Sequence, residues 1–162
     1  MSEMIIRNAR GADIPAMIEL LSELFSIESD FSIDSSAQRK GLAALLNTTE
    51  KTVVKVAVEE DCVVGMVTGQ VVISTAEGGN SMLVEDLVVK PGCRGRGIGS
   101  ALLADIEESA QDRQCLRMQL LADKRNTAAL KFYAGRNWSR THMITVRKSL
   151  RKDNVLMEYG CA

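Results

Sequence analysis

The residues best suited to chemistry gather in the stretch Val84–Gly99. A strand pattern stops at Pro91-Gly92, three closely spaced glycines follow (Gly95, Gly97 and Gly99), and a helix pattern begins at once. Glycines let the backbone approach a ligand, and the first turn of a helix presents unpaired N–H donors and a positive dipole end. The arginines Arg94 and Arg96 can add charge-assisted hydrogen bonds. This stretch therefore predicts a site for phosphate oxygens.

Three phosphate-binding patterns can be compared with this turn. A Walker A loop needs Gly-Lys followed by Ser or Thr, which is absent here. A dinucleotide fingerprint needs GxGxxG early in a βαβ unit, whereas this chain has GxGxG after antiparallel hairpin patterns. The pattern Arg-x-x-Gly-x-Gly fits at Arg94, Gly97 and Gly99. Spacing alone also leaves open a tight strand-to-helix connection that binds nothing.

Further polar residues stand on the elements beside this turn. Asn126, Leu130 and Tyr133 are spaced i, i+4 and i+7, so they share one helical face. In the strand before the turn, strict alternation predicts Glu85 on one face with Leu87 and Val89, and Asp86 on the opposite face.

Periodicity predicts the elements that must position these residues. We expect a short strand at 5–7, a helix at 14–25 with Asp13 as its N-cap, and a helix at 37–46. Strands are predicted at 52–58, 62–74, 82–89 and 116–121, with a helix at 97–111 and another from Asn126 to about 135. Residues 138–150 supply final strand material. The order β-α-α-β-β-β-α-β-α-β-β predicts one α/β domain over residues 1–162.

Composition excludes several classes of protein. The chain has 162 residues and 25% charged residues, contains no long apolar run and begins without a secretory signal pattern, so we expect a cytoplasmic protein. With one histidine, His142, and four scattered cysteines, we expect no metal site and no histidine base. Residues 1–86 hold 14 acidic and 6 basic side chains, whereas residues 87–162 hold 7 and 14. The basic half lacks interleaved aromatic residues, which favours a small polyanion over nucleic acid.

These features together resemble the GCN5-related N-acetyltransferase (GNAT) superfamily. The resemblance includes the strand Glu85–Val89, the glycine turn, the following helix and the segment Asn126–Tyr133, which is similar to the family's Asn-x-x-Ala-x-x-x-Tyr. It covers roughly residues 4–150, and it departs from the family at Asn137-Trp138, where Gly-Phe is usual. It implies an α/β (α+β) GNAT fold, with a mixed, mostly antiparallel central sheet of six to seven strands flanked by four helices.

The resemblance also implies an activity and its residues. The activity is direct transfer of the acetyl group of acetyl-CoA, the co-substrate, to a primary amine, without a metal. The pyrophosphate would be held at Arg94, Gly95, Arg96, Gly97, Ile98, Gly99 and Ser100. Leu87, Val88 and Val89 would lie along the pantetheine arm, with a backbone N–H of Leu87 or Val88 polarising the thioester carbonyl. Asn126 would contact the pantetheine, Tyr133 would act as general acid near the sulfur, and Glu85 would act as general base.

The acceptor is expected to be a small cationic molecule. The family's first two helices and their connection form one wall of the acceptor site, and here that region has no basic residue from Asp13 to Gln38. It carries five acids: Glu19, Glu23, Glu28, Asp30 and Asp34. A solvated helix face explains Glu19 and Glu23 equally well.

Other interpretations stay open at this point. Glu85 could bind only the cationic acceptor or an arginine, and Tyr133 could be a packing residue. The enzyme could instead acetylate a protein N-terminus or lysine, or the domain could be a CoA-binding sensor without turnover. We expect no nucleic-acid or membrane partner, and a homodimer that uses the tail 151–162 is possible.

Overall fold

The computed structural model describes residues 3–151. The chain divides into two compact units, Met1–Asp123 and Lys124–Ala162, which are described separately below. A single domain over residues 1–162 stays a prediction. The tail beyond residue 151, which was considered for dimerisation, lies outside the described residues.

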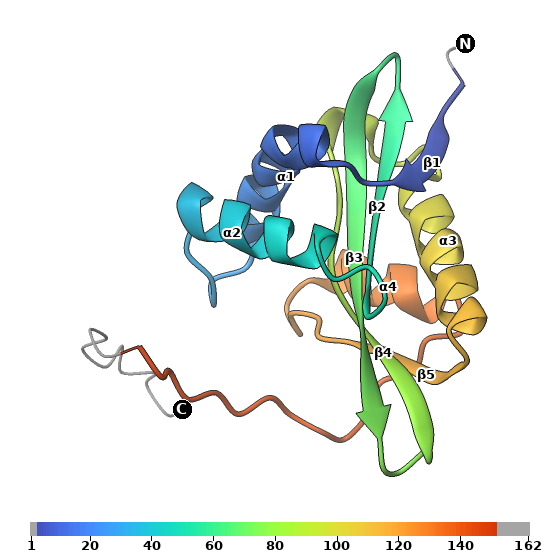
Figure 1. Cartoon of the computed structure of the whole chain (residues 1–162). Helices are drawn as coiled ribbons and strands as arrows, with labels where there is room; N and C mark the ends of the chain where they lie inside the picture. The colour runs from blue at the N-terminus through green and yellow to red at the C-terminus, as the bar shows by residue number, and fades with distance from the viewer. Residues whose placement is uncertain (1–2, 152–162) are drawn as a thin grey trace. The chain divides into compact units, whose positions relative to one another are not determined.

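The first unit contains a five-stranded sheet in the order β1-β2-β3-β4-β5. The strands are β1 (Ile5–Asn8), β2 (Thr52–Glu59), β3 (Cys62–Ser74), β4 (Gly79–Val89) and β5 (Cys115–Leu120). Neighbouring strands are antiparallel except β4 and β5, which are parallel. The helices of this unit are α1 (Ile14–Ile27), α2 (Ser35–Leu46) and α3 (Ile98–Asp112) (Figure 1).

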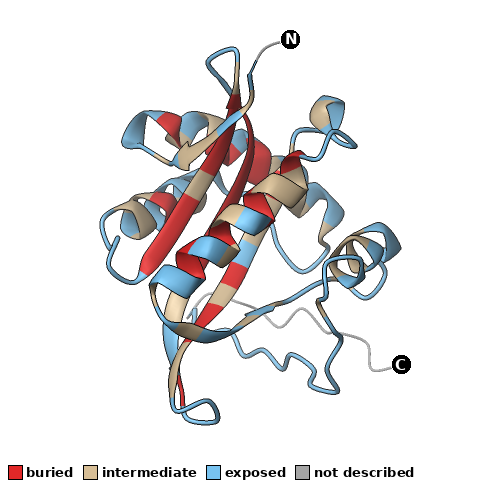
Figure 2. Ribbon diagram, turned by 90° about the vertical axis from the view of Figure 1, so that its right-hand side faces the viewer, coloured by how far each residue is buried: buried red, intermediate tan, exposed pale blue. Residues whose placement is uncertain are grey.

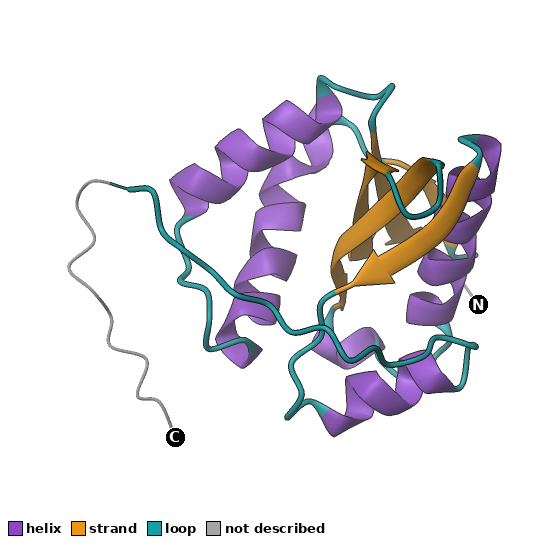
Figure 3. Ribbon diagram, turned by 90° about the horizontal axis from the view of Figure 1, so that it is seen from below, coloured by secondary structure: helices purple, strands orange, loops and turns teal. Residues whose placement is uncertain are grey.

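Helices α1 and α2 lie against one face of the sheet and α3 lies against the other (Figure 3). Between α1, α2 and the first face lies an apolar core. It is formed by Met17, Ile18, Leu20, Leu21, Leu42, Val54, Val56, Val58, Met66 and Val88. The second face buries the periodic residues Ile98, Leu102, Ile106 and Ala110 of α3, as the sequence predicts (Figure 2).

Two glycines of β3 let α3 approach the sheet closely. A Cβ built on Gly65 would lie 3.0 Å from Leu102 Cδ1, and one on Gly69 would lie 2.8 Å from both Ile106 Cδ1 and Met82 Sδ. Side chains at these positions would push the helix away. The distance between α3 and the sheet is therefore set by the absence of two side chains.

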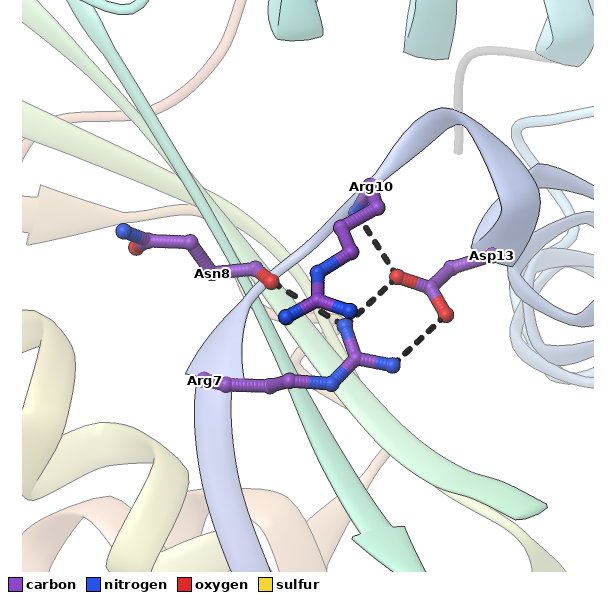
Figure 4. A network of polar contacts seen from close by, with 4 residues as sticks. All are labelled: Arg7, Asn8, Arg10 and Asp13. Carbon is purple, nitrogen blue, oxygen red and sulfur yellow. Dashed lines mark hydrogen bonds and ion pairs between the residues drawn. The ribbon is translucent and has the colours of Figure 1, made fainter. Parts of the chain in front are cut away.

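Asp13 stands before α1 as predicted, but it does not cap the helix through its side chain. Its carboxylate instead accepts two bonds from the Arg7 guanidinium, at 2.7 and 2.9 Å, and one from the Arg10 backbone N–H at 2.7 Å (Figure 4). The pKa of Asp13 is lowered, chiefly by the hydrogen bond from Arg7. Because a bidentate guanidinium bond is stronger than a cap to one N–H, Asp13 ties the end of β1 to the start of α1.

The second unit contains helix α4 (Thr127–Ala134). Its predicted cap is confirmed, because the Asn126 Oδ1 accepts from the Ala129 N–H at 3.1 Å.

The prediction of six to seven strands is wrong for the described residues, which form five. Residues 138–150, expected as strand material, carry no helix or strand. Their apolar side chains Met143, Ile144, Val146 and Leu150 are 85–87% exposed. A strand is stable only when a neighbour satisfies its backbone groups, and apolar alternation in sequence does not supply that neighbour.

Candidate active site

The sheet opens between β4 and β5. The two strands pair only from Asn80 with Cys115 to Val84 with Leu120, whereas β4 continues to Val89. On this side the segment Glu85–Val89 has no strand partner in the described part of the chain. The open segment contains the predicted residues Leu87, Val88 and Val89. Its backbone edge is therefore available for pairing with an extended ligand.

A β-bulge interrupts β4 at the start of this open segment. Glu85 pairs with Thr68 and Val88 pairs with Met66, so Asp86 and Leu87 together stand opposite Val67 alone. The backbone of Asp86 is left-handed, with φ 36°. An L-residue adopts this conformation only where the surrounding structure enforces it.

The bulge overturns the predicted assignment of faces. Glu85 shares the face of Thr68, and Val88 packs into the core beneath α1 and α2, so both lie on that face although they are three residues apart. Val89 pairs with Gly65, which faces α3. Asp86 reaches the same face as Glu85, because its carboxylate bonds Thr68. Glu85 therefore does not alternate with Val89, and Asp86 does not point away from Glu85.

Asp86 has an unusual electrostatic environment. Thr68 is 1% exposed, and its hydroxyl donates to Asp86 Oδ2 at 3.0 Å. The pKa of Asp86 is raised to about 6, first by burial and then by the charge of Glu85, while the Thr68 hydrogen bond opposes the shift. Asp86 can therefore exchange a proton near neutral pH, as a general base must.

Glu28, at the end of α1, lies within the field of the same acids. Burial raises its pKa first, followed by the charges of Asp86, Asp123, Asp30 and Glu85. We call these five residues the acidic cluster: Glu28, Asp30, Glu85, Asp86 and Asp123. Their mutual repulsion would be relieved by a bound cation.

The connection between α1 and α2 also contains a helix cap and exposed apolar side chains. Asp34 caps α2 by accepting from the Ser36 and Ala37 N–H groups, both at 3.1 Å. The rings of Phe25 and Phe31 pack 5.4 Å apart, and Ile27, Phe31 and Ile33 in the same connection are about half exposed. An apolar surface thus adjoins the negative charge.

The glycine turn between β4 and α3 is open to solvent. Gly95 and Gly97 have φ values of 75° and 82°, and a Cβ on either would meet nothing within 4 Å. In the part of the chain that the structure describes, the N–H groups of Gly95 through Gly99 donate to no backbone carbonyl; the nearest such bonds are those of Arg94 and Ala101. The exposed donors at the α3 N-terminus fit the phosphate oxygens of a nucleotide such as CoA.

The two arginines of the turn bind to protein groups. Arg94 Nε donates to the Val89 carbonyl at 2.9 Å. The Arg96 guanidinium makes a bidentate pair with Glu59, at 2.7 and 3.0 Å. Ile98 is buried in the core under α3, whereas Gly99 and Ser100 are partly exposed. Both guanidinium groups are therefore engaged within the protein, whereas the backbone N–H groups of the turn make no backbone hydrogen bond among the described residues.

Tyr133 and Asn126 belong to the second unit. Asn126 is occupied in part as the cap of α4. The Tyr133 ring packs 5.2 Å from Phe132 and 5.8 Å from Trp138. These ring contacts give Tyr133 a defined orientation within its unit.

Sequence reasoning missed Thr68 and Glu59 and ranked Asp86 below Glu85. The adjacent acids Glu85 and Asp86 indicate a polar site in the sequence. No sequence pattern indicates the bulge that turns both side chains to one face. Among the described residues no group of acidic, cysteine and histidine side chains could hold a metal ion. None of the helices in residues 3–151 is long and apolar enough to cross a bilayer.

Comparison with known proteins agrees with this geometry. The family model described as "Acetyltransferase (GNAT) family" matches residues 14–137. Thialysine N-epsilon-acetyltransferase of Bos taurus is 30% identical over 141 residues, which cover 82% of each chain. Aminoalkylphosphonate N-acetyltransferase of Salmonella typhimurium is 29% identical over 138 residues, covering 85% of this chain and 86% of the relative. An aminoglycoside N-acetyltransferase solved in complex with CoA has a TM-score of 0.80 at 16% identity, and the match covers 93% of this chain and 97% of that structure's chain.

The chain therefore belongs to the GNAT acetyltransferase family and is an N-acetyltransferase. This confirms the expected family and enzyme class. The fold is the expected α/β architecture with four helices, with the strand number corrected above.

Proposed function

We propose that this protein transfers the acetyl group of acetyl-CoA directly to a primary amine of a small cationic molecule. The observation that carries the proposal is the bulged, open end of β4, where Glu85 and Asp86 reach one face and act, with Asp30 and Asp123, on the charge of Glu28. A cationic acceptor and an extended thioester arm could meet there.

The co-substrate would bind along two adjoining features. The diphosphate would accept from the backbone N–H groups of residues 95–99, and the open edge at Leu87–Val89 would pair with the pantetheine arm. Acetyl-CoA supplies an acyl group already activated as a thioester. The exposure of the turn and its N–H groups supports this arrangement.

The acceptor amine must lose a proton before it can attack. An alkyl amine has a pKa near ~10.4, so only about one molecule in two thousand is neutral at pH 7. Glu85 and Asp86 are the candidates for accepting this proton. Asp86 is favoured as the base, because the buried Thr68 fixes its carboxylate at the bulge and its pKa of about 6 lies near working pH. The more exposed Glu85 would then bind the cationic acceptor or pass the proton through water.

Tyr133 is proposed to stabilise the departing thiolate. A tyrosine pKa near ~10 against a thiol near ~8.5 makes full proton transfer uphill by about 2 kcal/mol. Hydrogen bonding from the phenol therefore suffices for its role. Asn126 would contact the pantetheine through the amide NH₂ group, since its oxygen caps α4.

The acidic cluster favours an acceptor with two or more amino groups. The amine that reacts must be neutral, so it is not attracted by the five carboxylates. A second amino group that stays cationic would be attracted by them and would strengthen binding of the acceptor. The exposed apolar residues of the α1–α2 connection would contact an alkyl spacer between the two groups. The named relatives act on thialysine and on aminoalkylphosphonate, which are amines that also carry acidic groups.

A thiol-release assay over a panel of acceptors tests the proposal. Diamines and polyamines should exceed amino acids, aminoalkylphosphonates, aminoglycosides and peptides in kcat/KM. Preference for a phosphonate or a peptide would contradict the cationic acceptor. Release of no thiol with any amine, despite cofactor binding, would favour a sensor.

Binding of the co-substrate has a separate test. Acetyl-CoA should raise the melting temperature of the wild type, and Gly97→Glu should abolish this shift by placing a carboxylate in the turn. Gly78→Glu is the matched control, because Gly78 also has a positive φ, 69°, and open space around it, but lies at the β3–β4 turn. A control that loses the shift as well would reject the glycine turn as the binding site.

A further inference from the structure

The glycine turn is tied to a distant hairpin by one ion pair. Arg96 Nη2 lies 2.7 Å from Glu59 Oε1, and Nη1 lies 3.0 Å from Oε2. The Glu59 side chain is 13% exposed and that of Arg96 is 51% exposed. Glu59 raises the pKa of Arg96 through this hydrogen bond. Two parallel bonds fix the direction of a guanidinium as well as its distance.

The carboxylate itself is held in place by backbone geometry. Glu59 ends β2 and pairs with Cys62 across a two-residue turn. The two turn residues, Glu60 and Asp61, have φ values of 47° and 62°. Such a turn matches the twist of its strands and permits little variation. Glu59 is therefore a rigid anchor for Arg96.

The other contacts that hold the turn are local: the Arg94 N–H donates to the Pro91 carbonyl at 3.3 Å, and the Cys93 side chain adds a hydrogen bond to Arg96. A Cβ built on Gly95 or Gly97 would meet nothing within 4 Å, so no packing contact fixes these two residues. The other arginine, Arg94, bonds to Val89, only five residues away. A loop that is free before binding must lose that freedom when it binds, which weakens affinity.

We propose that Glu59 is a positioning residue for the co-substrate: it holds Arg96, and through Arg96 it keeps the N–H groups of the glycine turn directed outward. This inference rests on the proposed binding of acetyl-CoA at that turn. Glu59 touches neither the acyl group nor the acceptor in this role.

Charge and geometry predict opposite signs for the removal of Glu59. A carboxylate near a diphosphate repels it, so by charge alone Glu59→Gln would tighten binding. If Glu59 acts by positioning, Glu59→Gln weakens binding by about fivefold. Glu60→Gln removes the same charge from the neighbouring position and serves as the matched control.

The experiment is calorimetric titration of CoA into the full chain at fixed ionic strength, for the wild type, Glu59→Gln, Glu60→Gln, Arg96→Gln and the double variant Glu59→Gln/Arg96→Gln. We expect weaker binding for Glu59→Gln, equal or tighter binding for Glu60→Gln, and no added effect of Glu59→Gln once Arg96 is replaced. At saturating acetyl-CoA, kcat of Glu59→Gln should equal that of the wild type. In the free protein, the NMR backbone order parameters of residues 95–99 should fall in Glu59→Gln, and Glu59→Asp should restore part of the order.

The outcomes separate the two proposals. If the wild type binds CoA and Glu59→Gln binds it equally or more tightly, the positioning role is overturned. The proposed function then stays intact. A further loss from Glu59→Gln in the Arg96→Gln background would also overturn it, since Glu59 would then not act through Arg96. Wild type that fails to bind CoA would overturn the proposed co-substrate site itself.

Discussion

The two halves of β4 serve different purposes. From Asn80 to Val84 the strand lies between β3 and β5, and its side chains Met82 and Val84 are 0% and 1% exposed. From Glu85 to Val89 its only strand partner among the described residues is β3; this half contains a bulge and a left-handed residue and holds a carboxylate of raised pKa. One strand thus contributes stability at its start and reactive groups at its end.

The difference follows from the number of neighbours. A strand paired on both sides has its backbone hydrogen bonds satisfied and its register fixed. A strand paired on one side can take up a bulge and offer its other edge to a ligand. Comparing variants of the two halves tests whether stability and chemistry are separable here.

The largest expected change in stability is in the paired half. Met82→Ala removes a fully buried side chain that fills the space beside Gly69. This variant should lower the free energy of unfolding by about 3 kcal/mol. Denaturant unfolding monitors this loss, while kcat of the folded fraction should stay near that of the wild type. A variant as stable as the wild type would show that this half does not carry the core.

The largest expected change in activity is in the open half. Asp86→Asn should lower kcat by about 100-fold, because the amide cannot accept the proton of the amine. Glu85→Gln is the companion variant and should raise KM for the cationic acceptor more than it lowers kcat. If Glu85→Gln instead gives the greater loss of kcat and removes the high-rate limb of the pH profile, Glu85 is the base, as first expected from sequence.

Asp86 should also make stability depend on pH with an unusual sign. Its pKa is about 6 when folded and 3.8 when unfolded, so between these values the folded state binds more protons. Stability contributed by Asp86 is therefore full below about pH 4 and decreases up to about pH 6, by at most about 3 kcal/mol. Asp86→Asn removes this decrease, so the variant should be more stable than the wild type at pH 7 by about 1 kcal/mol or more. Equal melting temperatures of the two proteins at pH 7 would contradict the raised pKa.

The smallest expected effect is on the pKa itself. Thr68→Val keeps the shape of the side chain but removes the hydrogen bond to the charged form of Asp86, so the pKa of Asp86 should rise by about one unit. The acid limb of the pH profile of kcat/KM should move to higher pH by the same amount, with little change at pH 9. An unmoved limb would separate Asp86 from the rate-controlling proton transfer.

Much of the fold could be predicted from local pattern. The helix over Ile98–Asp112 was expected because apolar residues recur at helical spacing, and the Asn126 cap because its side chain bonds a nearby N–H. Asp13 occupies the N-cap position of α1 as predicted, but its side chain does not cap the helix, since a guanidinium from β1 binds the same carboxylate. The strand expected within residues 138–150 was wrong for a related reason: strand formation depends on a partner that the segment does not itself contain.

The sequence by itself determined the glycine turn, the order of elements from the first strand to α4, and the adjacent pair of acids, because these depend on residue type and on spacing along one short segment. Only the tertiary structure decided that Glu85 and Asp86 reach one face, that Thr68 bonds Asp86, and that Glu59 holds Arg96. The first two depend on strand register, in which one extra residue reverses every following side chain, and the third depends on a contact between segments 37 residues apart. Register is set by pairing between distant segments, and no local pattern in β4 encodes it.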